Sequence, residues 1–167
     1  MCIRDSCRFE AAAVEMKVVF DAASRIAGFF VVPAQAHHAW TCPAYADTLR
    51  FTEREVTVGA PGWPLPGTLT VPAGPGPHPA VLLVHGSGPN DRDETVGHNR
   101  PFRDLAWGLA SRGVAVLRYE KRTRAHAARV AEMLDSLTVR EETVDDAVAA
   151  LASLLSLIHI SEPTRPY

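Results

Sequence analysis

The alternation of apolar and polar residues predicts a β-hairpin near the start of the chain. Residues 14–20 and residues 26–32 are rich in β-branched and aromatic side chains, which favour strands. The polar residues 21–25 between them can form the turn, and Pro33 ends the second strand because proline has no backbone donor. The Ala-rich stretch that follows has no period and predicts an interdomain linker over residues 34–48.

A second unit, with both strand and helix patterns, begins near residue 49. Residues 52–58 predict a strand with one solvated face, and Gly- and Pro-rich turns surround a short strand at residues 69–71. The uninterrupted apolar run at residues 80–84 predicts a strand buried on both faces, and residues 114–117 predict another. With helices between them, these strands predict an α/β fold in which parallel strands follow an antiparallel meander.

Two helices are predicted in this second unit. One begins at Pro101 and ends before Gly113, since proline suits the first helical position and glycine the residue past the end. The other begins at Thr138, whose hydroxyl can form a capping box with Glu141 three residues later. The apolar faces expected to be buried are Phe102, Leu105, Ala106 and Leu109 in the first helix and Val144, Val148, Leu151 and Leu155 in the second. The solvated face of the second helix is expected to consist of Glu141, Glu142, Asp145 and Asp146.

Composition excludes several classes of protein. The 167 residues hold 17 Lys and Arg against 19 Asp and Glu, and a net charge of −2 offers no basic surface for nucleic acid or an anionic membrane. The longest apolar stretch, residues 26–32, is too short to span a bilayer. Cys2, Cys7 and Cys42 form neither a metal-binding pair nor an even disulfide framework. We therefore expect no metal, no cofactor, no nucleic acid and no membrane as partners, and leave the oligomeric state open.

The two ends of the chain resemble translated sequencing-adapter DNA. A codon choice for residues 1–6 has a reverse complement that encodes Leu-Ser-Leu-Ile-His-Ile, which is the sequence of residues 155–160. Residues that come from adapters do not belong to the natural protein and carry no information about its fold. We therefore expect residues 1–6 and residues 155–167 to be adapter-derived, and the remaining sequence assigns no compartment.

The most distinctive chemistry follows the apolar run at residues 80–84. Gly86 and Gly88 permit backbone conformations that side chains would block, so main-chain N–H groups there can point into a cavity. An oxyanion hole requires such rigid donors at the place where negative charge develops. Because ligands of open α/β sheets bind beyond the carboxyl ends of the strands, this loop is the candidate site.

The order of these segments resembles the beginning of an α/β-hydrolase domain. Residues 85–89 look like the oxyanion loop after the third strand, residues 101–106 like the first helix, and residues 118–122 like the loop after the fourth strand. The resemblance covers about residues 52–154. The proteins that this segment resembles are bacterial hydrolases related to dienelactone hydrolases and serine aminopeptidases.

The same resemblance predicts the domain organisation. Residues 7–33 resemble the last hairpin of a small nuclear-transport-factor-2-like α+β domain, which precedes the hydrolase domain in some of these relatives. We therefore expect that hairpin, the linker over residues 34–48, and an incomplete α/β-hydrolase domain over residues 49–154.

The resemblance implies a serine hydrolase that acts on a small-molecule carboxylic ester or similar acyl compound through a Ser-His-Asp triad. It makes the backbone N–H of Ser87 one oxyanion donor, with Gly86 shaping the turn. No serine of the chain lies in G-x-S-x-G; Ser87 fails because His85 stands where glycine is needed. The nucleophile, acid and base are expected beyond residue 154, so that the chain alone is inactive. Two alternatives stay open: a non-catalytic binding module on this scaffold, and a library artefact without a cellular product.

The other candidate residues are interpreted as structural. His85 is expected only to shape the loop, and residues 86–88 lack the Lys-Ser/Thr pair and the third glycine of phosphate-binding loops. His37 and His38 are expected to face solvent rather than a metal. Polar residues 90–93 should satisfy their own backbone, and the charged residues 118–122 should pair with the aspartates there.

Overall fold

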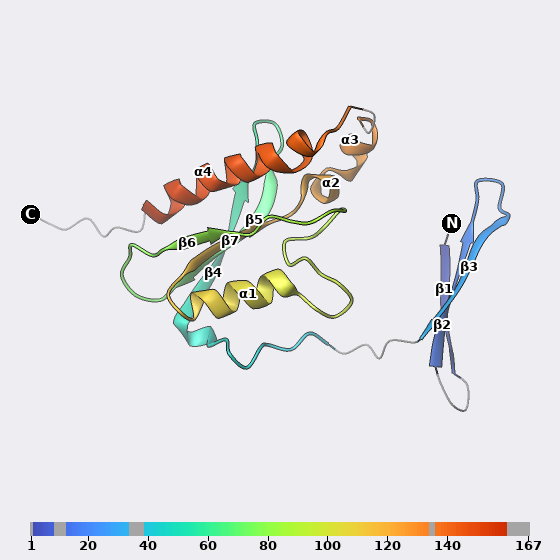
Figure 1. Ribbon diagram of the computed structural model, residues 1–167, viewed down its shortest axis with the longest axis horizontal. Helices are drawn as coiled ribbons and strands as arrows, with labels where there is room; N and C mark the ends of the chain where they lie inside the picture. Colours follow the sequence, from blue (N-terminus) through green and yellow to red (C-terminus); the bar gives the residue numbers. More distant parts are fainter. Residues whose placement is uncertain (1, 9–12, 34–38, 134–135, 160–167) are drawn as a thin grey trace, which may run out of the picture. The chain divides into compact units, whose positions relative to one another are not determined.

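The computed structural model describes residues 2–8, 13–33, 39–133 and 136–159 and divides the chain into two compact units (Figure 1). The first unit comprises Met1–Ala39 and the second Trp40–Tyr167. The predicted linker is therefore divided: residues 34–38 lie outside the described residues, and residues 40–48 belong to the second unit.

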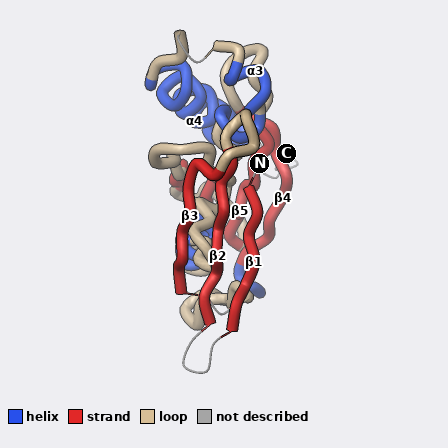
Figure 2. The backbone as a smooth tube through the Cα atoms, turned by 90° about the vertical axis from the view of Figure 1, so that its right-hand side faces the viewer, coloured by secondary structure: helices blue, strands red, loops and turns tan. Residues whose placement is uncertain are grey.

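The first unit is a three-stranded antiparallel sheet with β2 in the middle. Figure 2 shows its three strands side by side. Its strands are β1 (Cys2–Arg8), β2 (Ala13–Phe20) and β3 (Ile26–Pro33). The predicted hairpin is confirmed: Asp21 Oδ1 accepts hydrogen bonds from the Ala23 and Arg25 N–H groups and closes the turn.

The sheet of the second unit confirms the predicted fold class, an antiparallel meander followed by a parallel pair. Its strand order is β4-β5-β7-β6, with β6 and β7 parallel and the other neighbours antiparallel. The strands are β4 (Phe51–Val58), β5 (Leu65–Pro72), β6 (Ala80–Leu82) and β7 (Ala115–Tyr119), and the 3₁₀ turn η1 (Thr48–Arg50) precedes them.

Helices cover both faces of this sheet, with α1 and α4 on opposite sides in Figure 1. The long helices are α1 (Pro101–Ala110) and α4 (Asp145–His159). The short ones are α2 (Arg122–Ala125), α3 (Ala127–Ala131) and the π-helical turn η2 (Arg140–Val144), which runs into α4. The predicted capping box precedes η2: the Thr138 N–H and hydroxyl donate to the Glu141 carboxylate, and the Arg140 N–H donates to the hydroxyl oxygen.

The apolar core lies between the sheet and α4. Its buried members are Val58, Leu65, Leu69, Leu117, Tyr119, Ala150 and Leu154. The predicted core face of the second helix is wrong, because Val148 is 64% exposed whereas Leu154 is 1% exposed. Helix α4 carries two apolar stripes, and the one with the small Ala150 lies against the sheet because it permits close packing.

Two further burial expectations are wrong. The strand at residues 80–84 is shorter and lies at the edge of the described sheet, so Val81 is 37% and Val84 41% exposed instead of buried on both faces. In α1 Leu105 is 49% exposed, and the buried residues are Ala106, Gly108 and Ala110.

The chain before β4 packs against α1. The Trp40 indole N–H donates to Asp104 Oδ1 (2.9 Å), and the Asp47 N–H donates to Ser111 Oγ (2.8 Å). A Cβ on Gly108 would come within 2.8 Å of the Tyr45 ring, so glycine here permits the close approach. Residues 40–47, expected to be a linker, thus form a layer on this helix.

Candidate functional site

The candidate site is the loop that connects β6 to α1. Gly86 and Ser87 are both exposed, and Gly88 has a φ of +100°, a conformation that L side chains rarely adopt. Within the described part of the chain, no oxygen accepts a hydrogen bond from the Ser87 N–H. The loop therefore offers, on an exposed residue, a main-chain donor of the kind that an oxyanion hole requires.

The carbonyl groups of the same loop are held by three side chains. Lys121 Nζ donates to the Gly86 oxygen (2.9 Å), Asn90 Nδ2 to the Ser87 oxygen (3.1 Å), and Thr123 Oγ1 to the Gly88 oxygen (3.4 Å). Lys121 and Thr123 come from the segment directly after β7. Because side chains bind its carbonyl oxygens, the loop has a defined orientation.

The polar stretch after the loop satisfies its own backbone, as predicted. Asp91 Oδ1 accepts hydrogen bonds from the Asp93 N–H (3.1 Å) and the Thr95 N–H (2.9 Å). Burial alone would raise the pKa of Asp91, but these donors favour the charged form and lower the pKa below its ordinary value.

A buried arginine joins this stretch to the sheet. Arg118, 3% exposed, donates from Nε to Asp93 Oδ1 (3.0 Å) and from Nη2 to Glu53 Oε1 (2.9 Å). The expected pairing of the 118–122 segment with the aspartates is thereby confirmed for Arg118 and Asp93. Burial raises the pKa of Glu53, but the Arg118 charge and hydrogen bonds to Oε1 outweigh it, so the pKa lies below its ordinary value.

A second arginine, Arg92 of the loop, binds side chains on the same face of the sheet. Arg92 donates to Glu120 Oε1 (3.0 Å), Glu55 Oε2 (2.5 Å) and Thr68 Oγ1 (2.7 Å). The Arg92 hydrogen bond lowers the pKa of Glu55 below its ordinary value. The predicted solvated face of β4 is confirmed, since Glu53, Glu55 and Thr57 are exposed. Two of its carboxylates also bind the arginines that position the loop.

His85 lies under the loop as an aromatic packing residue. It is 7% exposed, with its ring centroid 5.0 Å from that of Tyr119 and 5.6 Å from that of Phe102. Burial lowers the pKa of His85 and raises the pKa of Tyr119 to about 12. Within the described residues His85 Nε2 has no hydrogen-bond partner.

The carboxylates at the start of the last helix correct one prediction. Asp146, expected on the solvated face, is 1% exposed and forms a two-bond ion pair with Arg122 at 2.8 and 2.6 Å. Glu142 Oε1 lies 2.7 Å from Lys121 Nζ. The hydrogen bond from Lys121 to the Gly86 carbonyl was not predicted, because the two residues are far apart in the sequence. The only signal for it in the sequence was the position of Lys121 shortly after a buried strand.

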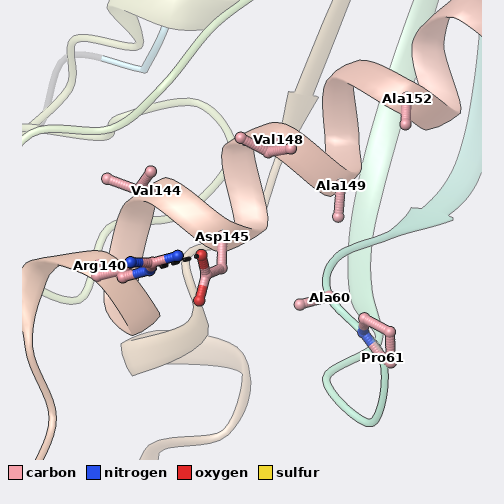
Figure 3. Close-up of a pocket in the computed structure, with 8 residues that line it drawn as sticks. All are labelled: Ala60, Pro61, Arg140, Val144, Asp145, Val148, Ala149 and Ala152. Carbon is pink, nitrogen blue, oxygen red and sulfur yellow. Dashed lines mark ion pairs between the residues drawn. The ribbon is translucent and has the colours of Figure 1, made fainter.

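An apolar groove lies on another part of the second unit, between α4 and the turn after β4 (Figure 3). Ala60 and Pro61 line one side, and Val148 and Ala149 the other, with the Arg140–Asp145 ion pair at one end. Neither Gly86 nor Ser87 lines it. The groove thus does not contain the predicted site residues.

Among the described residues, no group of three or more His, Cys, Asp or Glu side chains could hold a metal ion. His37 and His38 lie outside the described residues. In the part of the chain that the structure describes, no helix is long and apolar enough to cross a membrane.

The second unit thus has an α/β fold, and its sheet-edge loop carries a main-chain N–H for which the described residues supply no acceptor. The chain matches no family model. It is 42% identical over 149 residues to Esterase EstD of Thermotoga maritima, a match that covers 88% of this chain and 34% of the esterase. The chain therefore spans about a third of the esterase's length. This similarity supports the resemblance to α/β-hydrolases.

A solved structure is also similar to the chain. It is the Pyrococcus horikoshii acylaminoacyl peptidase (orthorhombic crystal form), at a TM-score of 0.46 and 16% identity, over 96% of this chain and 25% of that one.

Proposed function

We propose that the chain supplies the oxyanion loop of a serine hydrolase that acts on carboxylic esters or similar acyl compounds. The observation that carries the proposal is the N–H of the exposed Ser87, which has no acceptor among the described residues and lies on an anchored loop, in a chain 42% identical to an esterase. A rigid donor of this kind stabilises the negative charge that develops on a carbonyl oxygen during acyl transfer.

In the proposed reaction a serine hydroxyl attacks the acyl carbon while a histidine accepts its proton. The carbonyl oxygen gains the electron pair and accepts a hydrogen bond from the Ser87 N–H. When the tetrahedral intermediate collapses, the alcohol leaves with the proton and an acyl-enzyme remains, which water then hydrolyses.

The attacking serine is proposed to lie outside this sequence. Ser87 is not in a strand-to-helix elbow; it lies on an irregular loop, and no serine of the 167 residues has the G-x-S-x-G context. Ser87 therefore contributes its N–H and not its hydroxyl. His85, buried and without a partner for Nε2 among the described residues, is not proposed as the base.

Labelling with a fluorophosphonate probe tests the assignment of the nucleophile. The purified 167-residue chain should remain unlabelled, whereas a longer product of the same locus should be labelled and should hydrolyse p-nitrophenyl esters. Stoichiometric labelling of Ser87 would overturn this assignment. A longer product that binds esters without turnover would favour the non-catalytic binding module instead.

A pair of substitutions at one position tests the donor itself. In the longer product, Ser87→Ala keeps the backbone N–H, whereas Ser87→Pro removes it. We expect kcat of the proline variant to be roughly 10²- to 10³-fold below that of the alanine variant, the usual effect of losing one oxyanion donor. Equal values of kcat would refute the role of the N–H.

A further inference from the structure

Lys121 makes a contact that bears directly on the proposed oxyanion donor. Its Nζ donates to the Gly86 carbonyl oxygen (2.9 Å), and that carbonyl belongs to the same peptide unit as the Ser87 N–H. The C=O and N–H of a trans peptide point in opposite directions. With the Gly86 oxygen bound to Lys121, the Ser87 N–H is therefore directed away from the ammonium group.

Lys121 is itself fixed on three sides. Its side chain is 4% exposed, its Nζ lies 2.7 Å from Glu142 Oε1, and its own N–H donates to the Asn90 oxygen (3.2 Å). Glu142 lies in η2, so the contact connects the loop after β6 with the end of β7 and the start of the last helix. A buried ammonium that left the Gly86 carbonyl would lose a hydrogen bond that no water is at hand to replace, so the contact is costly to break.

The charge of Lys121 also changes the strength of the donor. A cation on a carbonyl oxygen draws electron density from the peptide group, and hydrogen bonds in such a chain polarise one another. The Ser87 N–H thus becomes a stronger donor toward an oxyanion than an N–H whose carbonyl faces water.

We infer that Lys121, oriented by Glu142, is a positioning residue that aims and polarises the Ser87 N–H. The inference rests on the proposed function, since it assigns Lys121 a part in the same site. Lys121 does not touch the substrate; it acts through the Gly86–Ser87 peptide. A purely structural role would require only that the Gly86 oxygen be satisfied.

Spectroscopy on the 167-residue chain tests the physical link without any turnover. Lys121→Met removes the charge and should move the Ser87 amide proton resonance upfield, while Lys121→Arg should restore part of the shift. Glu142→Gln, which leaves Lys121 in place but unpaired, should give a smaller change in the same direction. Arg124→Met is the matched control, because Arg124 is 54% exposed and pairs with Glu120, not with Gly86 or Ser87.

Kinetics on the longer hydrolase test the catalytic consequence. We expect Lys121→Met to lower kcat roughly 10- to 100-fold with little change in KM, because a misdirected donor weakens transition-state binding more than substrate binding. Lys121→Arg should recover part of kcat, and Arg124→Met should match the parent.

The possible failures are distinguishable. An active parent whose Ser87 amide resonance and kcat do not respond to Lys121→Met would overturn this inference and leave the proposed function intact. A longer product without esterase activity would overturn the proposed function, and with it the catalytic role of Lys121, even if the Ser87 resonance shifts. Equal losses of kcat in the Lys121→Met and Arg124→Met variants would reduce Lys121 to a structural residue.

Discussion

Arg122 and Asp146 illustrate how single residues carry this fold. Both side chains are almost fully buried, and two hydrogen bonds join them across 24 positions of the sequence. The Arg122 guanidinium also lies 4.5 Å from the centroid of the Trp63 ring. Taking two charges out of water is costly, so the pair depends on both partners being present.

Removing one partner of this pair should therefore be more harmful than changing both. We expect Arg122→Met to lower the free energy of unfolding by about 3–5 kcal/mol, because Asp146 is left as an uncompensated buried charge. The double variant Arg122→Met with Asp146→Asn should recover part of this loss, since the asparagine oxygen can still accept from the Ala60 N–H. Urea unfolding measures both.

An exposed arginine provides the control for the loss of charge. Arg50→Met should change the free energy of unfolding by less than about 0.5 kcal/mol. If the double variant were less stable than Arg122→Met alone, the uncompensated charge would not be the cause of the loss.

At the scale of elements, helix α4 shows that periodicity alone does not choose the buried face. The stripe with Val148 and the stripe with Ala150 and Leu154 are both apolar, yet only the second packs against the sheet. Close contact with the strands favours the stripe that contains a small residue. Val148 of the exposed stripe then lines the groove in Figure 3, together with Ala149 and Ala152.

Substitutions on the two stripes test this assignment. Val148→Lys should change the free energy of unfolding by less than about 0.5 kcal/mol, because its side chain already faces solvent. Leu154→Ala should cost about 2–5 kcal/mol, because it opens a cavity in the core. Thermal or urea unfolding distinguishes them, and a Val148→Lys variant as unstable as Leu154→Ala would mean that the exposed stripe is covered in solution.

At the scale of the whole molecule, His85, Glu53 and Glu55 couple stability to pH in one direction. Burial lowers the pKa of His85 in the folded state, and the net effect of their surroundings lowers those of Glu53 and Glu55. Between its folded and unfolded pKa values each group binds more protons when unfolded, so stability rises with pH. The His85 contribution is lost as pH falls below about 6.5, and the carboxylate contributions are lost at lower pH.

The His85 contribution can be isolated. We expect the urea midpoint of the parent chain to fall between about pH 7.5 and 5.5, the range that spans the ordinary histidine pKa. His85→Phe should reduce this fall because phenylalanine packs without titrating, whereas His78→Gln should keep it. A parent midpoint that rises on acidification over this range would contradict the lowered pKa of His85.

The sequence by itself determined the four strands and two long helices of the second unit and the place of its candidate loop. Apolar runs marked β6 and β7, Pro101 and Gly113 bounded α1, and the glycines after β6 marked the loop. These signals are local: a strand's apolar run and a helix cap depend on neighbouring residues only.

Only the tertiary structure decided which residues meet. Three features depend on contacts between residues that are distant in the chain: the hydrogen bond of Lys121 to the Gly86 carbonyl, the burial of Asp146 against its ion-pair partner, and the packing of one face of α4 on the sheet. Charged side chains have no sequence pattern that tells a solvated carboxylate from a buried one, because the difference lies in the partner. The loop and its link to Arg118 were therefore predictable from the sequence, whereas its link to Lys121 was not.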